Sequence, residues 1–396
     1  MSVAASKAPP PPAQEKKRRE LPGWVEKLLI PGVILLIAVC LPFFTDNQAF
    51  LQQCAVAAAY VVMALGLNII VGFAGLLDLG YVAFFAIGAF TVGWFASGHF
   101  AFVNNEEGIH FLVGGAAANL PGIHFNFLIV LVIAMVLTTI AGMIIGLPTL
   151  RLRGDYIAIV TLAFGEIIGR TAINGDEIKI GETPLTAGRQ GISPVDRIDL
   201  PFLEPFTVLD KAPWLWFALF LVVVVLFVNF RLRDSRMGRA WIALREDEVA
   251  AVAMGVPAVK TKLMAYGSGA AFGGISGAFL ASLLNTVNAD QFQFYFSILV
   301  LAMVILGGLG SIWGVVTGAI VLSIVNNYII PDVINDVPGN LGLDFDMTQI
   351  TFGIYGFLLV MMMILRPQGL IPEKRHKMEL VEHAETSDET LYTARA

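Results

Sequence analysis

Charged residues are scarce in this chain. They make up 14% of its 396 residues, whereas 57% are hydrophobic. Soluble domains carry about 25% charged residues. The apolar residues form runs longer than the roughly 18–20 residues that cross a bilayer as a helix, and these runs lack the alternation of transmembrane β-strands. The composition therefore excludes an ordinary soluble protein and predicts an all-α polytopic membrane protein.

Several patterns that carry chemistry are missing. The only two cysteines, Cys40 and Cys54, lie in or beside apolar runs and are interpreted as packing thiols, not as a disulfide framework or a metal site. The five histidines lack metal-ligand spacing, and no Gly-x-x-x-x-Gly-Lys-[Ser/Thr] phosphate loop is present. We expect no catalytic residue, no metal and no cofactor. Energy for uphill transport would then come from a gradient or from a partner.

Charge within the apolar runs is also scarce, because only Asp78, Asp155, Glu166 and Arg170 lie in or near them. Secondary transporters usually place ionisable residues in their spans for ion coupling, so this scarcity favours an external motor. Glu166 and Arg170 are four residues apart and share a helix face. We predict that they form a structural ion pair near the outer half of their span, with a substrate site as the alternative.

The apolar runs predict about ten transmembrane helices, some of them discontinuous. The predicted spans are 28–44, 49–72, 76–97, 126–148, 156–173, 214–230, 264–284, 296–308, 311–330 and 347–365. The predicted domains are a basic N-terminal tail over 1–27, a membrane domain over 28–370 and a C-terminal tail over 371–396. The first apolar run is interpreted as a retained span and not as a cleaved signal peptide, because no A-x-A-like cleavage site follows it.

The distribution of Lys and Arg sets the orientation, because these residues accumulate on the cytoplasmic side. With both termini inside, 20 of the 25 basic residues lie in cytoplasmic segments, seven of them in the loop 231–263. The loop 174–213, with four basic and seven acidic residues, is then periplasmic. Two interpretations of this long loop stay open, namely contact with a periplasmic partner and a solvated connector.

Two glycine clusters, Gly72–Gly80 and Gly307–Gly314, interrupt apolar runs at comparable places in the two halves of the chain. Such clusters suit discontinuous helices that line a pathway, and the pairing hints at an internal repeat. The alternative is close helix packing and helix–helix hydrogen bonding. The candidate pathway residues are Asn68, Gly72, Gly75, Tyr81, Gly307, Gly308 and Gly310.

The residue pattern over 241–257 predicts a short helix in the loop 231–263. Its acidic residues suit the positive end of a helix, and Gly255 followed by Pro257 ends it. A helix at the membrane's edge is what a soluble motor needs in order to push on a membrane subunit; an interfacial resting helix is the alternative. The candidate coupling residues are Arg245, Glu246, Glu248, Ala250, Ala251 and Gly255.

The motif Glu248-x-Ala250-Ala251-x-x-x-Gly255 resembles the "EAA" loop by which permeases of ATP-binding-cassette importers dock on their ATPase subunit. Longer stretches resemble branched-chain amino acid permeases of the LivM type, over roughly residues 28–370. These stretches are 66–72 (GLNIIVG), 75–81 (GLLDLGY), 150–162 (LRLRGDYIAIVTL) and 238–248 (GRAWIALREDE).

The resemblance implies a multi-pass permease of the bacterial inner membrane, surrounded by lipid. It implies a second homologous permease subunit, two ATP-binding subunits that hold the ATP, and a periplasmic binding protein that delivers Leu, Ile or Val. Nucleic acid is not expected as a partner.

The chain departs from the family pattern at Arg189-Gln190, where the family often has Pro-Asn. The substrate therefore stays open between branched-chain amino acids and the urea or short amides of related permeases. Two other classes, a stand-alone secondary transporter or channel and a membrane scaffold without transport, fit the coupling motif and the glycine-rich spans less well.

Overall fold

The computed structural model describes residues 23–101, 107–113, 120–149, 156–181, 183–200, 205–334, 351–366 and 368–371. It divides into two compact units, residues 1–46 and residues 47–396. In the first unit the described residues form α1 (Gly23–Phe44), whose second half, Leu35–Phe44, is a short apolar helix. Cys40 of this helix and Cys54 of the second unit are free thiols.

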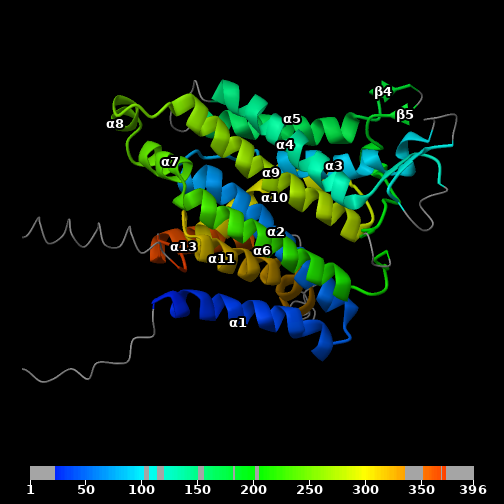
Figure 1. Ribbon diagram of the computed structural model, residues 1–396, viewed down its shortest axis with the longest axis horizontal. Helices are drawn as coiled ribbons and strands as arrows, with labels where there is room; N and C mark the ends of the chain where they lie inside the picture. The colour runs from blue at the N-terminus through cyan, green and yellow to red at the C-terminus, as the bar shows by residue number, and fades with distance from the viewer. Residues whose placement is uncertain are drawn as a thin grey trace, which may run out of the picture. The chain divides into compact units, whose positions relative to one another are not determined.

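The second unit is built mainly from helices (Figure 1). Its longer helices are α2 (Gln48–Leu67), α3 (Val82–Phe95), α4 (Phe127–Thr149), α5 (Tyr156–Asn174), α6 (Ala212–Asp234), α7 (Arg236–Glu246), α9 (Ala258–Leu284), α10 (Phe294–Gly307), α11 (Ile312–Ile324) and α13 (Thr351–Leu365). A short helix, α8 (Glu248–Ala253), lies between α7 and α9. Two π-helical segments, η1 (Asn68–Phe73) and η6 (Val325–Ile334), extend α2 and α11.

Helices among the described residues overlap all ten of the predicted spans. Six stretches are long and apolar enough to cross a membrane, and Val82–Phe95 and Phe294–Gly307 are shorter apolar helices in addition to Leu35–Phe44. The chain is therefore a polytopic, mostly helical membrane protein. The third helix begins at Val82 and not at residue 76, because residues 74–81 form an irregular connection that leaves the helical path.

The described residues are mostly helical, as predicted, and short strands of two or three residues lie in some of the connections between helices. The strands β1 (Ala96–Ser97), β3 (Ile123–Phe125) and β2 (Ile109–Phe111) form a small sheet in that order, with β1 antiparallel and β2 parallel to β3. A second pair, β4 (Lys179–Ile180) and β5 (Thr183–Pro184), is antiparallel. The remaining short turns are η2 (Gly98–Phe100), η4 (Gly188–Gln190) and η5 (Ala289–Phe292).

The core of the second unit is centred on α2 and α9, whose apolar windows are 83% and 78% buried. Small residues let the helices approach closely. A Cβ placed on Gly88 of α3 would come within 2.2 Å of the carbonyl oxygen of Gly274 on α9, so glycine is required for this crossing. Figure 1 shows α7 and α8 at one end of this unit and the strands β4 and β5 at the opposite end.

Candidate coupling and translocation site

The predicted coupling segment forms two helices instead of one. Asp247 has an extended backbone, ends α7 and starts α8. Its side chain accepts a hydrogen bond from the amide of Ala250 at 3.0 Å, an N-cap that favours a new helix start over continuation. The predicted single helix over 241–257 was therefore wrong at Asp247. The predicted stop was placed well, because α8 ends at Ala253 and Gly255 follows with φ +89°.

Two contacts fix these helices to the start of α9. The indole Nε1 of the buried Trp241 donates a hydrogen bond to the carbonyl oxygen of Thr261 at 2.8 Å. The Lys262 ammonium, buried except for 7% of its side chain, donates to Glu248 Oε1 at 2.6 Å. A displacement of α7 or α8 would therefore move α9 with it. Lys262 is a functional residue that sequence reasoning missed, since nothing in a separation of 14 residues indicates a contact.

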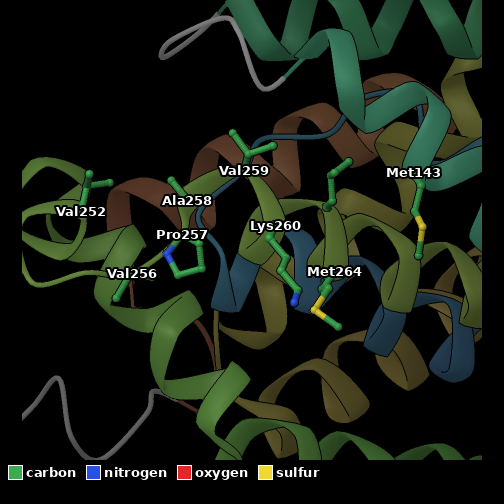
Figure 2. Close-up of a pocket in the computed structure, with 9 residues that line it drawn as sticks. Met143, Val252, Val256, Pro257, Ala258, Val259, Lys260 and Met264 are labelled. Carbon is green, nitrogen blue, oxygen red and sulfur yellow. The ribbon is translucent and has the colours of Figure 1, made fainter.

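The outer surface of α8 is apolar and open. Val249, Val252 and Met254 are 77%, 49% and 86% exposed, while Ala251 is buried against the rest of the chain. Glu246, Glu248 and Ala250 are also exposed. A groove of about 710 Å³ continues this surface (Figure 2). Its lining comes from the end of α8, the start of α9 and one residue of α4: Val252, Val256, Pro257, Ala258, Val259, Lys260, Leu263, Met264 and Met143.

Arg245, at the end of α7, contacts the connection between α2 and α3. Its guanidinium Nη1 donates a hydrogen bond to the carbonyl oxygen of Gly72 in η1. Gly75 has φ +69°, and a Cβ there would lie 2.7 Å from Arg245 Cγ. A larger residue at Gly75 would therefore meet both backbone strain and this side chain. The structure thus joins one predicted coupling residue to two predicted pathway residues.

The two glycine breaks lie against each other. Asn68, at the start of η1, accepts a hydrogen bond on Oδ1 from the amide of Gly310 at 3.0 Å. The break after α10 contains Gly308 and Gly310, both with positive φ, and the amide of Ile371 donates to the carbonyl oxygen of Gly307 at 3.1 Å. The two glycine-rich segments are therefore in direct contact, while the internal repeat stays a prediction.

The predicted pathway side chains lie inside this packing. Asn68 and Tyr81 have 0% exposure, and the Tyr81 hydroxyl donates to the carbonyl oxygen of Gly269 on α9 at 2.7 Å. Gly72 is equally enclosed, because a Cβ on it would meet Asn68 Oδ1 at 2.0 Å. In this conformation the side chains of Asn68 and Tyr81 form hydrogen bonds to neighbouring segments of the chain. Their place in a pathway stays a prediction.

The connection after η1 also rests on α5. The amide of Leu79 donates to Thr161 Oγ1 at 3.0 Å, and a Cβ on Gly80 would lie 1.9 Å from the carbonyl oxygen of Thr161. The buried Asp78 accepts from the amide of Gly80 at 2.8 Å and so shapes this turn. Residues 72–81 therefore touch α7 through Arg245 and α5 through Thr161. The sequence indicated Thr161 only as one residue of the family-like stretch 150–162.

Glu166 and Arg170 form the predicted ion pair on α5. Arg170 Nε lies 3.0 Å from Glu166 Oε1. The two side chains are 48% and 69% exposed, so they point away from the rest of this chain. A pair buried within the chain was therefore not found. Asp155, the fourth charge considered, lies outside the described residues.

At the end opposite α8, the long loop 174–213 folds back on the helices where it is described. The Thr186 hydroxyl donates to the carbonyl oxygen of Ala172 on α5 at 2.9 Å. The backbone of Ile192 forms an antiparallel bridge with that of Val287, which lies shortly after the end of α9. The family-divergent Arg189 and Gln190 lie exposed on the η4 turn. The loop is thus a folded element over these residues.

One ion pair ties the loop to the small sheet. His124 Nδ1 lies 2.6 Å from Asp196 Oδ2, and the His124 ring stacks on that of His110 at 5.3 Å between centroids. Burial lowers the pKa of His124, but the hydrogen bond from its ring to Asp196 and the charge of that carboxylate outweigh burial, so the pKa of His124 is raised.

Comparison with known proteins identifies the family. A model described as "Branched-chain amino acid transport system / permease component" matches residues 50–365. The high-affinity branched-chain amino acid transport system permease protein LivM of Escherichia coli is 35% identical over 376 residues, which cover 90% of this chain and 77% of that protein; LivM of Salmonella typhimurium matches equally.

A probable branched-chain amino acid transport permease protein LivM of Methanocaldococcus jannaschii is 27% identical over 332 residues, covering 80% of this chain and 91% of the relative. No solved structure matches the chain significantly. The family match, the polytopic helical fold and the helix pair at the edge of the membrane domain agree, and the chain belongs to the LivM-type permease components of branched-chain amino acid transport systems.

Proposed function

We propose that this chain is one of two homologous permease subunits of an importer for branched-chain amino acids in the bacterial inner membrane. Two ATPase subunits bind the permease pair from the cytoplasm, and a periplasmic binding protein delivers the amino acid. The contact between Arg245 and Gly72 carries this proposal, because it connects an exposed helix pair to a break between two membrane helices.

The orientation follows from charge. The end of the second unit that bears α7 and α8 carries Arg231, Arg233, Arg236 and Arg239. Basic residues of this density favour the cytoplasmic side. With the predicted ten spans, both termini then lie in the cytoplasm, and the 174–213 loop faces the periplasm, where the binding protein docks.

The ATPase contact is the apolar surface of α8 together with the groove beside it (Figure 2). Val249 and Val252 on this six-residue helix and Met254 directly after it are exposed, so the described residues of this chain do not bury them. Removing apolar surface from water stabilises a complex by about 25 cal/mol per Å². Burial of this surface against a protein partner is therefore favourable. Glu246 gives its rim a negative charge that orients a complementary basic surface, whereas the Glu248 carboxylate is paired with Lys262.

Coupling proceeds through the contacts around residues 72–81. A force on α8 reaches α9 through the Glu248–Lys262 pair, and a force on α7 reaches η1 through Arg245. Residues 78–80 pass the displacement to α5 through Thr161. A π-helical segment beside glycines with positive φ is a suitable hinge, because both allow local change without breaking the packing of whole helices.

The substrate assignment rests on the relatives, all of which are described as branched-chain amino acid permeases. The test is uptake by the four-subunit complex in proteoliposomes with its binding protein. We expect ATP-dependent uptake of leucine, isoleucine or valine that stops when the ATPase is inactivated. Uptake of urea or a short amide in preference to these amino acids would replace the substrate class. Uptake without ATPase subunits would overturn the mechanism.

A second measurement concerns where selection occurs. We expect the purified membrane complex without binding protein to bind leucine weakly, because Asn68 and Tyr81 are fully buried, with Asn68 Oδ1 engaged by the amide of Gly310 and the Tyr81 hydroxyl engaged by the carbonyl oxygen of Gly269. Equilibrium binding of radiolabelled leucine with micromolar or tighter affinity would show a true recognition site in the membrane part.

A further inference from the structure

Helix α5 has two different faces. One face packs on this chain through Ile157, Ala158, Thr161, Gly165, Gly169 and Ala172. The opposite face is exposed at Tyr156, Ile159, Ala163, Glu166, Ile167, Arg170 and Asn174. At 100° per residue these seven positions fall within a stripe about 100° wide. We call this stripe the outer face of α5.

The outer face is too polar for a surface covered by lipid tails. The apolar windows of α4 and α6 are 28% and 39% buried and have mean hydropathies of 2.9 and 2.5, as lipid-facing helices should. That of α9 has a hydropathy of 1.4 but is 78% buried. The window of α5 combines a hydropathy of 1.5 with only 33% burial. Its polar side chains are therefore not accounted for by lipid or by the described residues of the second unit.

The depth of the charges strengthens this argument. With a rise of 1.5 Å per residue, Glu166 lies about 15 Å from the start of α5 at Tyr156, near the middle of the helix. Arg170 lies about 6 Å from the end at Asn174 and can reach the interface. The shorter Glu166 side chain cannot, and ionisable groups at this depth face a protein interior or a water-filled cavity.

We propose that the outer face of α5 lines a water-filled passage for the amino acid, closed on its other side by the second permease subunit. This inference rests on the proposed function. In the passage, Glu166 meets the ammonium group of the amino acid and Arg170 meets its carboxylate, while Ile159, Ala163 and Ile167 meet its aliphatic side chain.

The passage holds its substrate only briefly. The 3.0 Å bond between Arg170 and Glu166 satisfies both charges while the passage is empty. A zwitterion that binds both side chains exchanges one set of ion pairs for another, so the net gain is small. This exchange reconciles a charged passage with weak binding and leaves tight selection to the binding protein.

The contacts of α5 connect the passage to the helices that contact the ATPase. Thr161 receives the turn 78–80 on the buried face, two helical turns or less from Glu166. At the opposite end, Thr186 and the η4 turn with Arg189 pack beside the end of α5. Arg189 therefore lies near the mouth through which an anionic carboxylate would arrive.

The first test measures water along α5. Cys40 and Cys54 are replaced by serine, and single cysteines are introduced as Ala163→Cys and Ile167→Cys on α5 and as Val132→Cys on the outward face of α4, where Val132 is 54% exposed. The complete complex is treated with a membrane-impermeant methanethiosulfonate, which reacts with thiolates in water. We expect A163C and I167C to react, more slowly with saturating leucine, and V132C to stay unreacted. Unreactive α5 cysteines in a complex that transports would overturn the proposal.

The second test separates a route from a structural pair. Glu166→Gln, Arg170→Gln and the exchange E166R/R170E are compared for assembled complex and for leucine uptake. We expect all three to assemble, with uptake lowered about tenfold or more in each, because the exchange restores a pair but reverses the order of charges along the passage. Lost assembly in the single variants with recovery of assembly and uptake in the exchange would assign the pair a structural role.

The uptake measurement depends on the substrate class, whereas the thiol-reactivity measurement does not. If the unaltered complex takes up urea and not leucine, the proposed function fails while the thiol reactivity of α5 still reports whether water lines it. If leucine uptake is normal and α5 is unreactive, only the passage proposal fails.

Discussion

The guanidinium of Arg245 donates a hydrogen bond to the carbonyl oxygen of Gly72, 173 residues earlier in the chain. A charged side chain on an exposed helix thereby holds a main-chain group at the break between two membrane helices. Because Gly75 also packs on the Arg245 stem, movement of α7 without movement of the connection would break two contacts at once.

Replacement of Arg245 by alanine should uncouple the transporter. We expect Arg245→Ala to assemble and to retain ATPase activity, with leucine uptake lowered about tenfold or more, since the loss removes a link between two moving parts. Arg239→Ala is the matched control, because Arg239 Nη1 donates to the carbonyl oxygen of Asp234 near its own helix. Equal losses of uptake in both variants would argue against a specific role of Arg245.

Gly255 allows a test of the α8 surface. A Cβ there has open space within 4 Å, but φ of +89° strains any other residue by about 1–2 kcal/mol. We expect Gly255→Glu to insert in the membrane and to lose ATP-driven uptake, because it adds a charge beside the apolar docking surface. Gly255→Asn, which tolerates positive φ better, should retain most uptake. Normal transport by G255E would refute the assignment of this surface.

Gly80 provides a test of packing between the connection and α5. A Cβ on Gly80 would meet the carbonyl oxygen of Thr161 at 1.9 Å, which requires a shift of backbone. We expect Gly80→Ala to lower stability by about 1–3 kcal/mol, the usual cost of overpacking. Gly356→Ala in α13, where nothing lies within 4 Å, should be neutral. Thermal unfolding in detergent compares the two, and a neutral G80A would show that α5 is not held by this contact.

The His124–Asp196 pair gives the end of the second unit opposite α8 a pH dependence. The raised pKa of His124 means that the folded state binds a proton more tightly than the unfolded state. The stabilisation is fully present below the unfolded pKa of about 6.5 and is lost as pH rises through the folded pKa. We expect the loss of melting temperature in His124→Gln to be largest in acid and to become smaller as pH rises through the folded pKa of His124.

His99 is the control for this pH series, since burial lowers its pKa. His99 contributes stability above about pH 6.5 that is lost as pH falls through its folded pKa, so the effect of His99→Gln should grow in the other direction. A pH-independent difference between H124Q and the unaltered chain would show that the pair is not charged.

The sequence permits prediction of the helices because long apolar runs leave few alternatives in a bilayer. It also permits prediction of the end of α8, since Gly255 and Pro257 are local signals. The break at Asp247 was missed although an aspartate is a good N-cap, because an acidic helix start and a cap within a longer helix look alike in sequence. Domain boundaries over 1–27 and 371–396 lie outside or partly outside the described residues and stay predictions.

The candidate site was harder to predict, because it depends on contacts between distant segments. Asn68 and Gly310 are 242 residues apart, and only the fold shows that one accepts a hydrogen bond from the other. The pairing of Glu166 with Arg170 followed from a spacing of four residues. The direction in which the pair faces could not be predicted, since one side of α5 carries mainly small residues and the other mixes apolar with polar residues, and both patterns occur in buried and in exposed helices.

The outer face of α5 has a consequence for the life of the protein in the cell. A subunit synthesised without its partner would hold Glu166 and Arg170 against lipid, where charged groups are costly. An unassembled chain with these charges exposed to lipid is therefore less stable in the bilayer than the assembled one. The same two side chains would then limit how much of this subunit accumulates alone, and its abundance would follow the supply of the partner chain.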